Sequence, residues 1–323
     1  MKEKIFYTSY LGSTASRLAV CMGISMRILQ LHKLNTQQIK DVEALVEECI
    51  KADGLERTIY LDNDINFYVN LDSFFLLYEE NRLVSVLAIF EPLEEEAEIT
   101  AYTLPSERKK GYFKALFEKA KTELLRFDLH RALFVTEPES HSGLAVLKAL
   151  EAKYSKSEYL LAYQFQNVEN RYSGKPAAEI PDDIIVLKEL TQDRIEEAAE
   201  ISSFIFDTDM DETRDVIELS MHSGYMKCYG AYINSRLAGI CNISFGAEQA
   251  SIFGFGISPK LQGKGHGRRL LRQVMALIKA KNFNVVTLHV GSENSRAYNL
   301  YTSEGFQIQT QYDYYEYRIG QTI

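Results

Sequence analysis

The chain has 323 residues, enough for two domains of roughly 150 residues each. Hydrophobic residues make up 46% of it and charged residues 25%, which is the composition of an ordinary globular protein and excludes a disordered, collagen-like or coiled-coil chain. The net charge of −9 argues against a nucleic-acid-binding protein, because phosphate affinity comes mainly from clustered Lys and Arg side chains, and it leaves cationic small molecules as possible partners.

The cysteines and the apolar segments point to no metal site and no membrane anchor. The cysteines are scattered without a C-x-x-C pair, which indicates neither a zinc site nor a disulfide framework (Cys21, Cys49, Cys228 and Cys241). No apolar run approaches the roughly 18 residues that span a bilayer. We therefore expect a soluble, cytoplasmic protein with reduced thiols, no metal, and neither a membrane nor a nucleic acid as partner.

Residues 1–25 precede the first convincing element. Lys2 and Lys4 stand before a short, interrupted apolar run, Leu18–Ile24, which imitates a signal peptide only weakly. Met26 lies directly before the first predicted strand, Arg27–Leu31. We expect this extension to be a misplaced start or a disordered tail outside the fold.

An internal repeat organises the rest of the chain. Asn81-Arg82-Leu83 matches Ser235-Arg236-Leu237 at a shift of 154 residues (236 minus 82), and the same shift holds downstream without a gap for Pro105 and Pro259, Gly111 and Gly265, and Glu139 and Glu293. Upstream, Leu31, Leu34 and Ile39 match Leu187, Leu190 and Ile195 at a shift of 156. The chain is therefore predicted to be a tandem repeat.

Each copy opens with a short strand and a helix, the helices being predicted at Gln37–Ile50 and Asp193–Ile205 from apolar residues at helical spacing. In the second copy the order strand, strand, strand, helix, strand, helix, strand follows at Lys227–Ile233, Leu237–Phe245, Ser251–Ile257, Arg268–Ala280, Val285–Val290, Ser295–Glu304 and Phe306–Ile319. The join is expected at residues 171–183, which hold Gly174, Pro176 and Pro181. The expected domains are residues 26–170 and 184–323.

The segment Gln262–Gly267 reads Gln-Gly-Lys-Gly-His-Gly and stands between a predicted strand and a predicted helix. Glycines there allow positive φ angles and close backbone approach, so successive N–H groups and the positive end of the helix can point at a phosphate. This turn is the strongest candidate ligand site in the sequence. A Walker-type nucleotide site is disfavoured, because Lys264 is followed by Gly265 and no Ser or Thr follows to hold Mg²⁺.

The turn forms part of a larger pattern. Gln262, Gly265 and Gly267 satisfy Gln/Arg-x-x-Gly-x-Gly/Ala, and further along the chain the pattern Asn-x-x-Ala-x-x-x-Tyr-x-x-x-Gly-Phe is met by Asn294, Ala297, Tyr301, Gly305 and Phe306. With these two motifs in the expected secondary-structure order, the second copy resembles the GCN5-related N-acetyltransferase (GNAT) family. The resemblance implies a mixed α/β (α+β) chain of two tandem GNAT folds, each a mostly antiparallel mixed sheet flanked by helices.

The resemblance further implies acetyl-CoA as co-substrate and an amine on a small molecule or a peptide as acceptor. The expected cofactor-binding residues are Ile257, Gln262, Gly263, Lys264, Gly265, His266, Gly267, Arg268 and Asn294. The pyrophosphate would lie on the amides of the glycine turn, with Lys260, Lys264, Arg268 and Arg269 as a basic rim, and the backbone N–H near Ile257 would polarise the thioester carbonyl. Surface lysines at a helix start and an ordinary N-cap for Asn294 are the alternatives.

Tyr301 is the expected catalytic acid, facing the departing coenzyme A thiolate. A phenol has a pKa of about 10 and is protonated at neutral pH, so a hydrogen bond to the sulfur would be its main service. Strand Ile252–Ile257 offers no carboxylate where many family members place a base. Glu248 and His289 are the candidates for that base, with a water relay or a purely structural histidine as alternatives.

An acidic segment precedes the strands of the second copy, in a region that often borders the acceptor cleft in this family: Asp207, Asp209, Asp211 and Glu212. It would suit a cationic acceptor, and a solvated loop or a helix cap is the more conservative interpretation.

The first copy is expected to be non-catalytic. Arg108, Lys109, Gly111 and Phe113 stand where the second copy has Gln262, Gly263, Gly265 and Gly267, while Ser140 and Leu147 stand at Asn294 and Tyr301. Leucine cannot donate a proton. We therefore expect this copy to be a structural partner, a wall of the acceptor site or a weak coenzyme A binder. The leading hypothesis for the chain is acetyl transfer by direct attack in the second copy, and the alternative is a non-catalytic acyl-CoA-binding sensor or scaffold.

Overall fold

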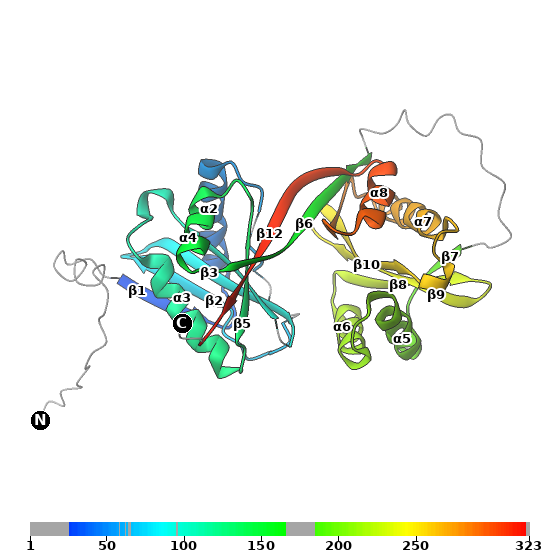
Figure 1. Ribbon diagram of the computed structural model, residues 1–323, viewed down its shortest axis with the longest axis horizontal. Coiled ribbons are helices and arrows are strands. Elements are labelled where there is room, and N and C mark those ends of the chain that lie inside the picture. Colours follow the sequence, from blue (N-terminus) through cyan, green and yellow to red (C-terminus); the bar gives the residue numbers. More distant parts are fainter. Residues whose placement is uncertain are drawn as a thin grey trace, which may run out of the picture. The chain divides into compact units, whose positions relative to one another are not determined.

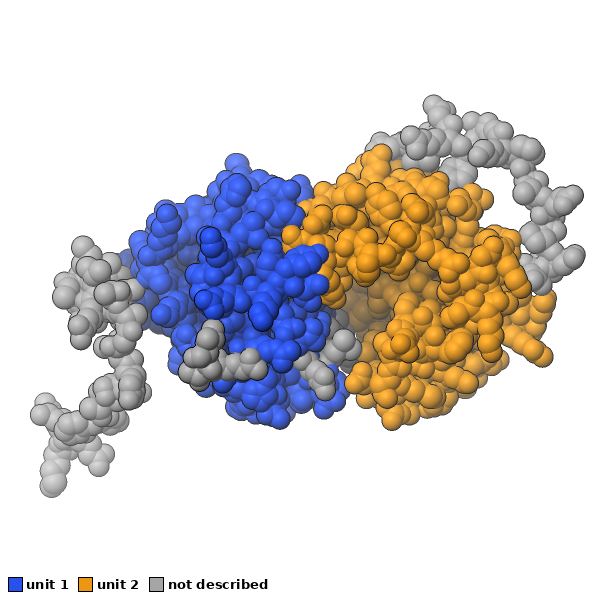
Figure 2. Space-filling model, in the orientation of Figure 1, with its two compact units in different colours: residues 1–155, 314–323 blue, residues 156–313 orange. Residues whose placement is uncertain are grey.

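The computed structural model describes residues 26–57, 59–61, 63, 66–94, 96–165 and 185–320. The chain forms two compact units, coloured separately in Figure 2. Unit 1 takes the residues up to Ser155 together with those from Tyr314 onward, and unit 2 takes Lys156–Asp313. Residues 1–25 and the join at residues 171–183 lie outside the described residues.

Unit 1 is a mixed sheet with helices. Its elements are β1 (Met26–Leu31), α2 (Thr36–Asp53), β2 (Phe74–Glu79), β3 (Arg82–Leu93), β4 (Glu96–Thr103), α3 (Tyr112–Arg126), β5 (Arg131–Thr136), α4 (His141–Ala149) and the start of β6 (Lys153–Gln164). The strand order is β1-β2-β3-β4-β5-β12, in which β1 to β4 pair antiparallel and β4 pairs parallel with β5.

Unit 2 repeats this plan. Its elements are β7 (Ile185–Glu189), α5 (Ile195–Phe206), α6 (Met210–His222), β8 (Met226–Ile233), β9 (Arg236–Phe245), β10 (Gln249–Ile257), α7 (His266–Ala280), β11 (Val285–Gly291), α8 (Ser295–Ser303) and most of β12 (Gln307–Arg318). The order is β7-β8-β9-β10-β11-β6, in which only β10 and β11 are parallel.

The two copies exchange their final strands. β6 ends the first copy in sequence, yet Glu158–Gln164 pair antiparallel with β11 of unit 2. β12 ends the second copy, yet Glu316 accepts from Arg131 of β5 in unit 1 (Nε to Oε2, 3.1 Å), and the Ile319 N–H donates to the carbonyl of His130. The compact units therefore cross the contiguous division expected from the sequence.

Helical spacing explains the layers of unit 2. α7 buries Leu270, Leu271, Val274 and Ile278, which recur along one face and pack on the sheet. α5 and α6 pack a smaller apolar cluster on the opposite face, with Ala198, Ala199 and Ile217 against Cys228 and Ile240. Figure 1 shows α7 and α8 on one side of this sheet and α5 and α6 on the other.

Most element boundaries lie within a few residues of those expected. Asn35 caps α2 through a capping box, and the helix ends at Gly54 with φ +68°. The acidic segment is in part a helix cap, because Asp209 Oδ1 accepts from the N–H groups of Asp211 and Glu212 at the start of α6.

Within the described residues, no helix has the length and apolar character to cross a membrane, and no group of three or more His, Cys, Asp and Glu side chains is arranged to hold a metal ion. The cysteines that the structure describes, Cys49, Cys228 and Cys241, are buried free thiols.

Candidate active site

The parallel pair at the centre of unit 2 splits open. β10 and β11 are in register from Gln249 opposite Val285 to Ile252 opposite Leu288, and the pairing ends there. Phe253–Ile257 and His289–Gly291 continue as two diverging strand ends. Strand ends that no longer pair with each other can offer backbone N–H and C=O groups to a ligand between them.

A β-bulge on β10 begins where this pairing ends. Phe253 lies opposite Asn242 of β9 and Gly256 lies opposite Ile240, so β10 has one more residue than β9 in this stretch. Gly254 sits in the bulge with φ +52°, a conformation that favours glycine. A bulge breaks the regular ladder and redirects backbone groups, which makes this part of β10 a place for a ligand to contact N–H groups.

The equivalent strand of unit 1 has no such bulge. β3 and β4 stay in register from Ser85 opposite Thr103 to Phe90 opposite Glu98, and their register shifts only between Phe90 and Leu93. The two copies therefore differ in backbone geometry at the point where their β-strands separate.

The glycine turn follows β10 through a short 3₁₀ helix, η4 (Pro259–Leu261). Gly263 and Gly265 have φ of +79° and +78°, and Gly265 is the N-cap of α7 without a side-chain cap. No side chain therefore caps the first N–H groups of α7, and such groups can bind an anion.

The side chains of Gln262 and Arg268 both form hydrogen bonds with other groups of the protein. Gln262 Nε2 donates to the carbonyl oxygen of Ile257 (2.9 Å), and its Oε1 accepts from Arg296, so this side chain clamps the turn. Arg268 Nη1 donates to the buried carboxylate of Glu304 (2.6 Å), which also binds Arg272.

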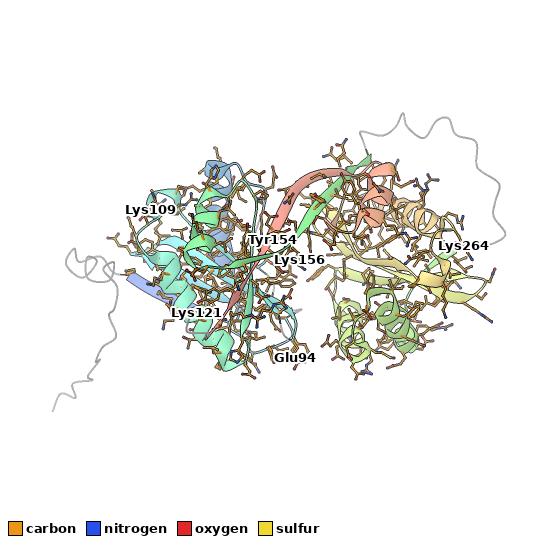
Figure 3. All side chains as sticks on the ribbon, in the orientation of Figure 1. Glu94, Lys109, Lys121, Tyr154, Lys156 and Lys264 are labelled. Atoms are coloured by element: carbon orange, nitrogen blue, oxygen red, sulfur yellow. The ribbon has the colours of Figure 1, made fainter. Side chains whose placement is uncertain are left out.

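The remaining residues of the turn divide between the interior and the surface. His266 is buried at the start of α7, and its Nδ1 accepts from Arg269 (2.6 Å). Lys264 is exposed and makes no ion pair with the described residues; Figure 3 labels it beside its turn.

The structure brings Tyr301 of α8 to the bulge. Its ring centroid lies 6.0 Å from that of Phe255, a bulge residue, and 5.9 Å from that of Phe306. Burial raises the pKa of Tyr301 well above the ordinary phenol range, so the hydroxyl keeps its proton at neutral pH. Asn294 is the N-cap of α8 and accepts from the Ala297 N–H (3.1 Å).

The two candidate bases lie in different places. Glu248 precedes β10, at the end opposite the glycine turn, and the strand between them extends roughly 26 Å at about 3.3 Å per residue. His289 is the first residue of β11 beyond the pairing with β10. Its half-exposed ring stacks on Tyr312, and its Nδ1 lies 3.8 Å from Glu158 Oε2. Only His289 is therefore at the opening between the strands.

Unit 1 contains a cavity that the sequence did not anticipate. It has a volume of about 430 Å³ and lies where β4 and β5 separate, bounded by the start of α3, by α4 and by residues 53–57. Its wall is largely apolar, with Ile99, Phe134, Val135 and Leu147 among the lining residues.

The turn beside this cavity keeps the geometry of its counterpart in unit 2. Arg108 Nε donates to the carbonyl of Thr103 (3.1 Å), as Gln262 does to Ile257. Lys109 and Gly111 have φ of +65° and +86°, and Ser140 caps α4 by accepting from Gly143. Arg108 also forms a two-pronged ion pair with Asp53. Figure 3 labels Lys109 in this turn.

Comparison with known proteins finds relatives of the second copy. Residues 191–306 match the acetyltransferase (GNAT) family model. An uncharacterized N-acetyltransferase of Bacillus subtilis (strain 168), YvbK, is 29% identical over 121 residues, which cover 36% of this chain and 76% of that protein.

Two solved structures resemble the chain over most of its length. A GCN5-related N-acetyltransferase from Sphaerobacter thermophilus has a TM-score of 0.69 at 14% identity and covers 92% of this chain and 97% of its own. A tandem GNAT protein from the clavulanic acid biosynthesis pathway has a TM-score of 0.67 at 14% identity, with coverage of 93% and 100%. At these identities the likeness establishes the fold: two tandem GNAT folds.

Proposed function

Because the chain belongs to the GNAT family, we propose that unit 2 transfers an acetyl group from acetyl-CoA to an amine by direct attack. The observation that carries the proposal is the meeting of three features at one place in unit 2. These are the split between β10 and β11, the bulge at Gly254 and the buried Tyr301, which adjoin one another. The glycine turn comes after β10 in the chain and leads into α7.

Each part has a task in the reaction. The N–H groups at the start of α7 hold the pyrophosphate, and the pantetheine arm runs between the diverging strands to the bulge. The amine lone pair attacks the thioester carbon, and the carbonyl π electrons move onto oxygen, where bulge N–H groups stabilise them. Collapse re-forms the carbonyl and expels the coenzyme A thiolate, which receives a hydrogen bond from Tyr301. The amide nitrogen loses its extra proton to His289 or to water.

The acceptor is an amine on a small molecule or a peptide. Asp207, Asp209, Asp211 and Glu212 lie at the end of α5 and the start of α6, and this negative charge favours a cationic acceptor. The ring of Phe206 lies against Gly256, so the acidic segment adjoins the bulged strand.

Thiol release tests the proposal. The full chain is incubated with acetyl-CoA and a panel of amines that includes diamines, amino acids and peptide N-termini, and free coenzyme A is measured. We expect release that depends on an amine and falls by at least tenfold in Tyr301→Phe. Tyr298→Phe on the same helix is the matched control and retains the rate. A wild-type chain that releases no coenzyme A above background contradicts the proposal, and so does an unchanged rate in Tyr301→Phe.

A second candidate function, acyl-CoA binding without turnover, is favoured by the cavity of unit 1. That unit keeps the turn geometry but has Leu147, which cannot bind a thiolate, in the cavity wall. If unit 1 also binds acetyl-CoA, calorimetric titration should give two equivalents bound per chain. Gly111→Asp should remove one of them, because it places a carboxylate at the start of α3. A single equivalent that Gly111→Asp leaves intact contradicts binding by unit 1.

A further inference from the structure

The cavity of unit 1 is apolar at positions that are polar in unit 2. Several residues of β5 and α4 that line the cavity are aliphatic, and the 154-residue correspondence places a polar residue at each of these positions in the other copy. The pairs are Val135 and His289, Ala145 and Asn299, Leu147 and Tyr301, and Ala149 and Ser303. Unit 1 therefore presents apolar surface to a ligand where unit 2 has hydrogen-bonding groups.

The cavity opens to solvent between the start of α3 and α4. Gly111, Lys114 and Ala145 line this mouth and are exposed. At the other end the lining residues Leu55 and Glu137 are buried. A ligand that enters beside α3 therefore reaches a buried end.

The polar groups at the buried end bind one another. Glu137 accepts from the backbone N–H groups of Glu56 (3.0 Å) and Arg57 (2.6 Å). The guanidinium of Arg57 donates in turn to Thr100 (Nη2 to Oγ1, 3.0 Å). Because these groups are hydrogen-bonded within the protein, a ligand does not have to supply polar groups at this end.

The charge at the mouth that is not paired within the described residues is positive. Lys109 and Lys114 line the cavity, are exposed and form no ion pair with any of these residues. The acidic lining residues Asp53 and Glu107 are each paired with a basic side chain of the turn. No side chain caps the start of α3, so its N–H groups add to the positive potential. An anionic group is therefore favoured at the mouth.

We propose that unit 1 binds a ligand made of an aliphatic chain longer than acetyl and an anionic head group, with the chain inside the cavity and the head group at Lys109 and Lys114. The cavity volume of about 430 Å³ lies within the range of roughly 300–1,000 Å³ that is usual for small-molecule sites. Each methylene group that enters such a wall lowers the Kd roughly fourfold.

A free carboxylate and an acyl-CoA both carry this chemistry. The inference deepens the second candidate function, ligand binding by unit 1, and it is independent of catalysis in unit 2.

The test is calorimetric titration of the full chain with two pairs of ligands, decanoate with acetate and decanoyl-CoA with acetyl-CoA. Leu147→Tyr puts the residue of unit 2 into the cavity wall and narrows the apolar space. The double variant Lys109→Glu/Lys114→Glu reverses the charge at the mouth and changes only exposed side chains. Lys119→Glu is its matched control, because Lys119 is exposed on α3 and does not line the cavity.

We expect the long-chain member of at least one pair to bind with a Kd at least about tenfold lower than that of its short-chain partner. Leu147→Tyr and the charge-reversed double variant should each raise this Kd about tenfold, and Lys119→Glu should bind as the wild type does. The pair that shows the preference identifies the source of the chain. The thermal unfolding of each variant without ligand shows that it is folded, and the double variant decides alone if Leu147→Tyr does not fold.

Other results overturn the inference. Equal Kd values within both pairs overturn the preference for an aliphatic chain. A long-chain ligand that the folded variants bind as tightly as the wild type lies outside this cavity and overturns the site. If no ligand of either pair is lost in these variants, binding by unit 1 falls as well. A wild type that binds decanoate and releases no coenzyme A overturns only the function proposed for unit 2.

Discussion

Glu91 of unit 1 should make the stability of the protein depend on pH near neutrality. Its side chain is fully buried at the irregular end of β3. Its Oε2 accepts from the Tyr68 N–H (3.1 Å), and its Oε1 accepts from no described residue. Burial raises the pKa of this carboxyl from 4.5 to about 7.

Proton linkage gives the direction and the size of the change in the free energy of unfolding with pH. Between pH 4.5 and 7 the folded state binds more protons at Glu91 than the unfolded state does, so the free energy of unfolding falls as the pH rises. At about 1.4 kcal/mol per pKa unit, the loss is about 3 kcal/mol once the pH exceeds 7. Glu91→Gln cannot ionise and should escape this loss.

The assay compares the wild type with Glu91→Gln, so that the contributions of all other titrating groups cancel in the difference. The chain has no tryptophan, and urea unfolding is therefore followed by circular dichroism. We expect similar stabilities at pH 4.5 and a Glu91→Gln protein that is more stable by about 3 kcal/mol at pH 8 in the transition of unit 1. A difference that does not change between these pH values would refute the argument.

Three further predictions follow from the packing. Residues 185–323 expressed alone should aggregate or fail to fold, because β11 loses its partner β6; a well-folded monomer of this fragment would contradict the exchange of strands. Glu304→Leu should destabilise unit 2 by about 1–3 kcal/mol in thermal unfolding, because it leaves Arg268 and Arg272 without their buried carboxylate, and the partial exposure of both arginines keeps the loss below that of a fully buried pair. In a Cys21→Ser chain the native protein should not react with a disulfide reagent at pH 8, because burial raises the thiol pKa of Cys49 to about 11 and of Cys228 to about 12 and raises that of Cys241 further; rapid labelling of one equivalent would contradict this.

The order of elements and the glycine turn could be predicted from the sequence because local chemistry determines them. Apolar residues at helical spacing set α7, and glycines at positive φ set the turn at Gly263 and Gly265. Asn294 and Ser140 both act as helix caps, which residue type alone suggests. These features depend on residues close together in the chain.

The exchange of strands and the bulge depend on long-range pairing. β6 is the last strand of the first copy and β12 is the last strand of the second. The residues of the two strands do not indicate which sheet each one joins. The bulge at Gly254 leaves no gap in the alignment of the two copies, because unit 1 has its own extra residue between Phe90 and Leu93. The 154-residue shift therefore holds both before and after the bulge, and the sequence repeat does not reveal it.

A matched pair of substitutions tests most directly whether the chemistry takes place in unit 2. Gly265→Asp and Gly111→Asp each put a carboxylate at the equivalent helix start, where it repels a phosphate, and both are compared with the wild type for the initial rate of coenzyme A release. We predict that Gly265→Asp loses amine-dependent release of coenzyme A and that Gly111→Asp keeps it. Coenzyme A release that survives in Gly265→Asp and disappears in Gly111→Asp would contradict this prediction.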